Sequence, residues 1–91
     1  MNIPSNAVPG RRTPTFTAET MPAALTKHHR TTVWAELVVL QGAVQFVNDG
    51  VRNVVVVAAG GRLAIVPDVY HHIEPSDDAC FYIQFYDNHR E

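Results

Sequence analysis

Four of the five histidines stand in two adjacent pairs, His28-His29 and His71-His72. Neighbouring side chains on a β-strand point to opposite faces, so each pair, if it lies on a strand, directs one imidazole inward and one outward. Imidazole nitrogens are good ligands for divalent ions of the zinc, iron, nickel or copper type. The two pairs therefore predict a metal site to which each contributes one histidine. The fifth histidine, His89, stands in a polar tail and is expected to face solvent.

Two imidazoles alone seldom hold a metal tightly, so a third ligand or water must complete the coordination shell. Glu74, Glu36 and Gln84 are the nearby candidates. Glu74 stands three residues after His71, so a regular strand places it on the opposite face, where a solvated or ion-paired carboxylate is an equal interpretation. The direction of Glu36 stays open between the interior and solvent. A coordination position without a protein ligand suits water, an oxyanion or a substrate.

Other catalytic signatures are missing from the sequence. No Gly-x-Ser-x-Gly elbow, phosphate-binding glycine loop or Cys-x-x-Cys occurs. Cys80 stands in an apolar run and is expected to behave as a small buried hydrophobe. Arg11 and Arg12 form the only compact basic spot, for which we expect solvent exposure. The residues thus favour binding over catalysis.

Strand patterns dominate the chain from residue 33 onward. The Asn48-Asp49-Gly50 sequence predicts a hairpin turn, because these residues tolerate positive φ at little cost. Residues 53–58 form a continuous apolar run, which is typical of a strand buried on both faces. Pro22 interrupts the only helical-looking window, so helix content should be low. The predicted strands are 13–17, 33–40, 43–47, 53–58, 62–66, 71–74 and 79–86.

These short strands predict one all-β domain. Seven or eight strands joined by short turns, without a helical crossover, close as a barrel or a sandwich and so hide their edges. Residues 1–12 contain two prolines and a glycine and are expected to be an irregular lead-in. Residues 13–86 form the predicted barrel, and residues 87–91 form a polar tail.

Composition bounds the partners and the compartment. The 91 residues are 46% hydrophobic and 18% charged, with a formal net charge of −2, which argues against nucleic acid or an anionic membrane as partner. An apolar chain with so few charges favours self-association, most simply as a homodimer. One cysteine allows no internal disulfide, and we find no signal peptide or membrane-spanning run. A cytoplasmic location is therefore predicted.

Several short segments occur in a recognisable order. They are Thr13-Pro14-Thr15-Phe16-Thr17, Met21-Pro22-Ala23, a histidine before Trp34, Val39-Leu40-Gln41-Gly42, the run Tyr70–Glu74 and the aromatic strand Phe81–Tyr86. With these segments, residues 11–86 resemble the TehB/YeaR-like family, a domain found in tellurite-resistance proteins. The resemblance implies a cupin-like double-stranded β-helix, that is, a jelly-roll barrel, often dimeric, with a metal inside the barrel.

The resemblance also ranks the ligands. Gly61, Pro67 and His71 approximate the second cupin motif, so His71 is the leading ligand. The family's first histidine corresponds to either His28 or His29, because the segment HHRTTVW is one or two residues shorter than the usual one. The HxH pattern and the glutamate that cupins place before the glycine turn are absent from their usual positions.

The resulting hypothesis is a small metal-binding cupin, non-catalytic or weakly catalytic. The metal is zinc, iron or nickel, held by His71 and one of His28 and His29, with Glu74 or Glu36 assisting. A small molecule or an oxyanion is the expected ligand in the barrel. The resemblance implies a role in tolerance to tellurite or to oxidative or metal stress. Two alternatives remain: a metal-dependent dioxygenase or isomerase acting on a small organic molecule, and a metal-free barrel that binds a ligand or a protein.

Overall fold

Strands account for nearly all the regular structure of the chain, as the sequence predicts. The computed structural model describes residues 2–88, and in them the only helix is the four-residue 3-10 helix η1. No helix of that part of the chain is long and apolar enough to cross a membrane. The elements are β1 Ala7–Arg12, β2 Phe16–Thr17, η1 Ala23–Thr26, β3 Ala35–Gln41, β4 Ala43–Asn48, β5 Asn53–Ala58, β6 Arg62–Ile65, β7 His71–Pro75 and β8 Cys80–Asn88.

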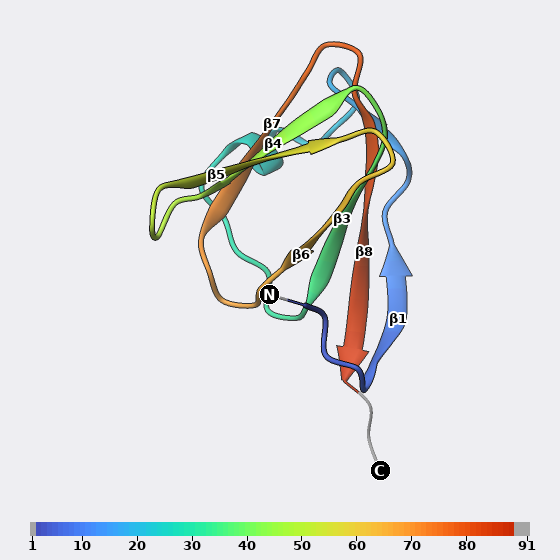
Figure 1. The fold of residues 1–91 in the computed structure, drawn as a ribbon, viewed down its shortest axis with the longest axis vertical. Coiled ribbons are helices and arrows are strands. Elements are labelled where there is room, and N and C mark those ends of the chain that lie inside the picture. The colour runs from blue at the N-terminus through green and yellow to red at the C-terminus, as the bar shows by residue number, and fades with distance from the viewer. Residues whose placement is uncertain (1, 89–91) are drawn as a thin grey trace.

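The strands form two antiparallel sheets (Figure 1). The larger sheet has the order β1-β8-β3-β6, with β2 also paired to β8, and the smaller has the order β5-β4-β7. The all-β class and the single small domain are therefore confirmed. The predicted closed barrel is wrong, because both sheets of the described residues end in edge strands, β1 and β6 in the larger and β5 and β7 in the smaller, and stay open.

The hydrophobic core lies between the two sheets. On β3 the alternate residues Ala35, Leu37 and Val39 are fully buried, so the residue between the first two, Glu36, points to the outer face of the larger sheet. The other buried core residues come from both sheets and the turn before β8: Val44, Phe46, Val57, Ile65, Ile73, Ala79, Phe81 and Ile83.

The chain passes from the larger to the smaller sheet at Gly42, where the sequence predicts a sharp bend. Gly42 has a φ of +68°, which favours glycine. A Cβ at this position would also lie 2.7 Å from Oδ1 of Asp78 and 2.8 Å from Oγ of Ser76. Only glycine therefore fits the bend without displacing these neighbours.

The N-terminal segment is more regular than predicted. Part of the expected lead-in, Ala7–Arg12, is strand β1, which pairs with the end of β8. Pro9 is tolerated because β1 is an edge strand, where a missing N–H costs little. Gly10 suits its position because any other residue would carry a Cβ only 2.6 Å from Oδ2 of Asp87, too close for a normal contact. The expected polar tail likewise begins within β8, and its His89 lies outside the described residues.

The apolar strand β5 is not buried on both faces, and that prediction is wrong. Val54 and Val56 are 52% and 61% exposed, whereas Val57 is 5% exposed. β5 is an edge strand of the smaller sheet, so its outer face is uncovered, and its inner face meets the core at Val57 but leaves Val55 37% exposed. This apolar strand is the kind of surface that self-association would cover, and the homodimer stays a prediction.

Adjacent valines of β5 test this placement. Val57→Ala should lower the free energy of unfolding by about 2 kcal/mol, because it removes two buried methyl groups and leaves a cavity. Val56→Ala, the matched control, should change it by less than about 0.5 kcal/mol. Urea denaturation followed by circular dichroism measures both. If both substitutions lowered the free energy of unfolding equally, and the loss grew with protein concentration, a second copy of the chain would cover β5 instead.

Candidate functional site

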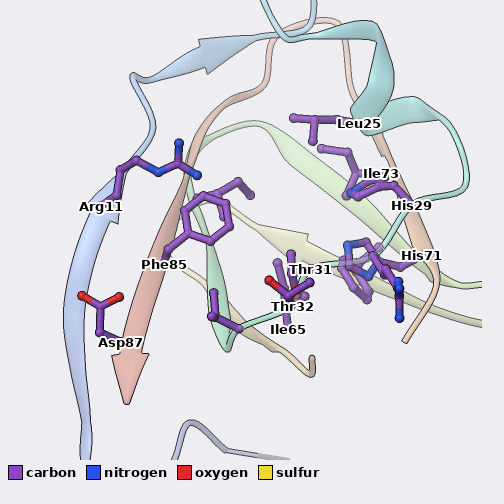
Figure 2. A pocket seen from close by; sticks show the side chains of 14 residues that line it. Arg11, Leu25, His29, Thr31, Thr32, Ile65, His71, Ile73, Phe85 and Asp87 are labelled. Atoms are coloured by element: carbon purple, nitrogen blue, oxygen red, sulfur yellow. The ribbon is translucent and has the colours of Figure 1, made fainter. Parts of the chain in front are cut away.

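The open arrangement of the sheets leaves a cavity of about 420 Å³ at one end of the core (Figure 2). Strands β1 and β8 form one side, and η1, the segment of residues 29–33 and strand β7 form the other. Most of the lining is apolar, with arginines, threonines, histidines and one aspartate between. The lining residues are Arg11, Leu25, His29, Arg30, Thr31, Thr32, Val33, Phe46, Ile65, His71, Ile73, Ile83, Phe85 and Asp87.

His29 and His71 meet in this cavity. Their backbones form an isolated antiparallel bridge, in which the amide of each donates to the carbonyl of the other at 2.9 and 2.7 Å. The ring centroids lie 4.4 Å apart at an interplanar angle of 74°. One imidazole from each histidine pair therefore faces the same cavity, and of the first pair it is His29.

Backbone carbonyls orient both rings. Nδ1 of His29 lies 2.7 Å from the carbonyl oxygen of Lys27, and Nδ1 of His71 lies 2.9 Å from that of Val69. A carbonyl only accepts, so in the neutral ring Nδ1 carries the hydrogen and Nε2 keeps its lone pair. Metal-binding histidines use this arrangement, in which the outer nitrogen donates to a carbonyl and fixes the tautomer.

Burial keeps His71 neutral. Its side chain is 2% exposed, and its ring centroid lies 4.8 Å from that of Phe46. Burial, and secondarily the charge of a protonated His29, lowers the pKa of His71 to about 4. At neutral pH the ring therefore offers a lone pair and carries no proton on Nε2.

The other histidine of each pair faces away from the cavity. Nδ1 of His28 and Nδ1 of His72 both lie 3.1 Å from Oδ2 of Asp49, and the His28 ring stacks on Tyr70 with centroids 4.3 Å apart. The hydrogen bond that His72 donates to Asp49 raises the pKa of His72 and lowers the pKa of Asp49. These groups form a polar cluster on the outside of the smaller sheet.

The predicted carboxylate ligands lie elsewhere. Glu74 is exposed on the outer face of β7, with Oε2 3.0 Å from Nε2 of His72. Glu36, on the outer face of the larger sheet, accepts hydrogen bonds from Arg62 and Tyr86, each at 3.2 Å. Within residues 2–88 no three His, Cys, Asp or Glu side chains are grouped so that they could hold a metal. Two imidazoles are what this cavity offers, and metal binding stays a prediction.

Sequence reasoning missed several cavity residues. Arg11 is exposed, as expected, but β1 also places its guanidinium carbon 4.9 Å from the centroid of the Phe85 ring, at the cavity edge, which the sequence did not predict. Thr31 also lines the cavity, and its hydroxyl is buried without a hydrogen-bond partner among the described residues. Arg11 was detectable only by predicting β1, and no spacing in the sequence marks Thr31.

Comparisons with known proteins agree with the fold. The family model of the TehB-like domain matches residues 11–83. The uncharacterized protein YeaR of Escherichia coli strain K12 is 30% identical over 98 residues, which cover 94% of this chain and 82% of YeaR.

Solved structures are similar as well. A crystal structure of a protein from E. coli strain K12 has a TM-score of 0.92 at 28% identity, covering 100% of this chain and 91% of that one. TehB from Haemophilus influenzae has a TM-score of 0.80 at 20% identity, covering 92% of this chain and 32% of TehB. At that identity the likeness to TehB concerns the fold alone.

The buried His71 predicts a loss of stability in acid. His71 takes up a proton near pH 6.5 in the unfolded chain and near pH 4 in the folded chain. The contribution of His71 to stability is therefore fully present above pH 6.5 and is lost as the pH falls toward 4. The loss through His71 reaches about 3 kcal/mol. Urea denaturation of metal-stripped protein between pH 7 and 4 measures it, and His71→Gln should flatten the profile.

His72→Gln is the matched control, with the opposite sign. Its raised pKa means that His72 contributes stability below pH 6.5, which fades as the pH rises through the folded value. Removing it should therefore steepen the loss on acidification. Identical profiles for the two variants would contradict the burial of His71 and the exposure of the outer cluster.

Proposed function

The chain belongs to the TehB-like domain family, and on that premise we propose that it is a small binding protein whose cavity takes a divalent transition metal through His29 and His71. One observation carries the proposal: the ring centroids of the two imidazoles lie 4.4 Å apart, and both Nδ1 atoms are hydrogen-bonded to backbone carbonyls. Their Nε2 lone pairs are then the atoms that bind the ion.

Two protein ligands leave further coordination positions to water, a small molecule or an oxyanion. When bound, the ion acts as a Lewis acid that holds and polarises such a ligand. His29 and His71 hold and orient it, and the apolar side chains around them limit the access of water. Imidazole ligation suits zinc, iron and nickel alike, so the donor set does not choose among them.

A cupin-like jelly roll is the finer form of the fold that we propose. Its support is the passage of the chain between the sheets: β3 lies in the larger sheet, β4 and β5 in the smaller, β6 in the larger, β7 in the smaller and β8 in the larger. In this interpretation the open edges are a reduced form of the jelly roll. For the cell, the family premise suggests a role in tolerance to tellurite or to oxidative or metal stress.

The cavity also supports a second candidate function, binding of a small organic molecule without a metal. Its volume of about 420 Å³ falls within the range of about 300–1,000 Å³ typical of small-molecule sites, and most of its lining is apolar. Catalysis as a dioxygenase or isomerase is not part of either candidate, because such sites use three or four firm ligands and this cavity offers two.

Metal titration distinguishes the two candidates. Tag-free protein, stripped with a chelator and dialysed, should bind one zinc or nickel ion per chain in isothermal titration calorimetry. His29→Ala should weaken the binding by more than about tenfold, since the loss of a second-shell partner alone costs that much. His71→Gln should do the same, and its circular dichroism spectrum shows whether the fold survives.

The chain supplies its own control in His28, the neighbour of His29 that faces outward. His28→Ala removes the same side chain from the same segment and should leave metal affinity within about twofold. Equal weakening in His28→Ala and His29→Ala would place the ion in the outer cluster. Wild-type protein that binds no metal would leave the metal-free candidate.

A further inference from the structure

A cation and a pair of imidazoles stand on opposite sides of the cavity. Figure 2 shows Arg11 on β1 across from His29 and His71, with Phe85 projecting from β8 beside the arginine. Arg11 lies in the β-bulge between Pro9 and Arg12, where β1 pairs with β8, and its guanidinium carbon lies 4.9 Å from the centroid of the Phe85 ring. Arg11 is exposed, and it thus presents a positive charge at the edge of the cavity.

Arg11 differs in this from the other arginines nearby. Within the described residues, ion pairs engage Arg30 with Asp68 at 3.3 Å and Arg62 with Glu36 at 3.2 Å, but none engages Arg11. The adjacent Arg12 lies over the Tyr82 ring at 4.4 Å and does not line the cavity. A guanidinium with its fork of donors available matches a carboxylate in shape and charge.

The hydroxyl of Thr31 points to a ligand independently. The residue lines the same cavity, and its buried hydroxyl has no hydrogen-bond partner in residues 2–88. Buried polar atoms are nearly always paired, and an exception in a cavity wall marks a position where a bound molecule or water supplies the partner. An oxygen of a ligand would satisfy it.

Between these polar groups the cavity is apolar, with side chains such as Phe46, Ile65, Ile73 and Phe85. Of its charged side chains, Arg30 is already ion-paired with Asp68, so Arg11 is the positive charge available to a ligand and Asp87 is the one carboxylate. A single negative charge on the ligand matches Arg11, and the nearby Asp87 disfavours a second.

We infer that this cavity binds a small monocarboxylate with an apolar body, and that Arg11 is the residue that recognises the carboxylate. The inference rests on the proposed function only in that it concerns the same cavity. The apolar body lies against the aromatic and aliphatic walls, and Thr31 provides a further polar contact. The His29 and His71 side of the cavity remains available to the metal.

Phenylacetate and its neutral isostere phenylacetamide test this inference, because they differ in charge and hardly in shape. Titration of metal-stripped, ¹⁵N-labelled protein, followed by ¹H–¹⁵N NMR spectra, gives both dissociation constants. We expect saturable shifts near Thr31 and Phe85 and at least about a tenfold preference for phenylacetate, the usual worth of a charge-assisted hydrogen bond. No saturable binding, or equal binding of the two, overturns the inference.

Neighbouring arginines provide the matched variants. Arg11→Gln should abolish the preference for phenylacetate, whereas Arg12→Gln removes the same charge one residue away and should preserve it. Asp87→Asn should strengthen phenylacetate binding by removing a like charge. A preference that survives in Arg11→Gln, or binding that weakens in Asp87→Asn, overturns the assignment.

The outcome is separable from that of the metal proposal. His29→Ala, assayed with phenylacetate in metal-stripped protein, should keep the Arg11-dependent preference while it loses metal. Failure of metal binding with a persistent preference rejects the metal proposal alone. Metal binding without any preference for the carboxylate rejects this inference alone.

Discussion

The site depends on two backbone hydrogen bonds between His29 and His71. They join the segment before β3 to the first residue of β7, two stretches that lie about forty residues apart in the chain. Residues that face each other in an antiparallel bridge direct their side chains to the same side, so the bridge alone sends both imidazoles into the cavity.

The outer cluster supports this register from the opposite face. The Asp49 carboxylate is hydrogen-bonded to His72 on β7 and to His28 in the segment before β3. The amide of Asp49 donates to the carbonyl of Tyr70 at 2.9 Å. A slip of one residue in either stretch would exchange the inward and outward histidines of that pair, so that His28 would face the cavity in place of His29, or His72 in place of His71. The contacts of Asp49 on the outside therefore help to fix the position of the rings inside.

Local pattern was enough for most of the strands. Strands β3 to β8 begin and end within about two residues of the predicted runs, because turn residues such as Asn48 and Gly42 bound them. Alternation also predicted one inward imidazole per histidine pair, and it placed Glu74 opposite His71. It did not decide between His28 and His29, because the bridge that decides is a long-range contact.

Long-range pairing explains the errors too. An apolar run such as Asn53–Ala58 looks the same at the edge of a sheet as at its centre, and only the order β5-β4-β7 shows that one face is uncovered. β1 escaped prediction because Pro9 and Gly10 suggest irregular chain, whereas an edge position beside β8 accommodates both. The sheets stay open because their edge strands, β1 and β6 in one and β5 and β7 in the other, do not pair with each other in the described residues.

Two features of the cavity lower the stability of the empty fold. A buried hydroxyl without a partner costs about 1–3 kcal/mol, and within residues 2–88 Thr31 carries one. Burial lowers the pKa of His71, and the resulting loss of stability grows as the pH falls. Valine, which has the shape of threonine, would avoid the first cost at position 31, and both costs are large beside a typical stability of about 5–15 kcal/mol. Their convergence on one cavity is what a binding site requires and a purely structural core does not.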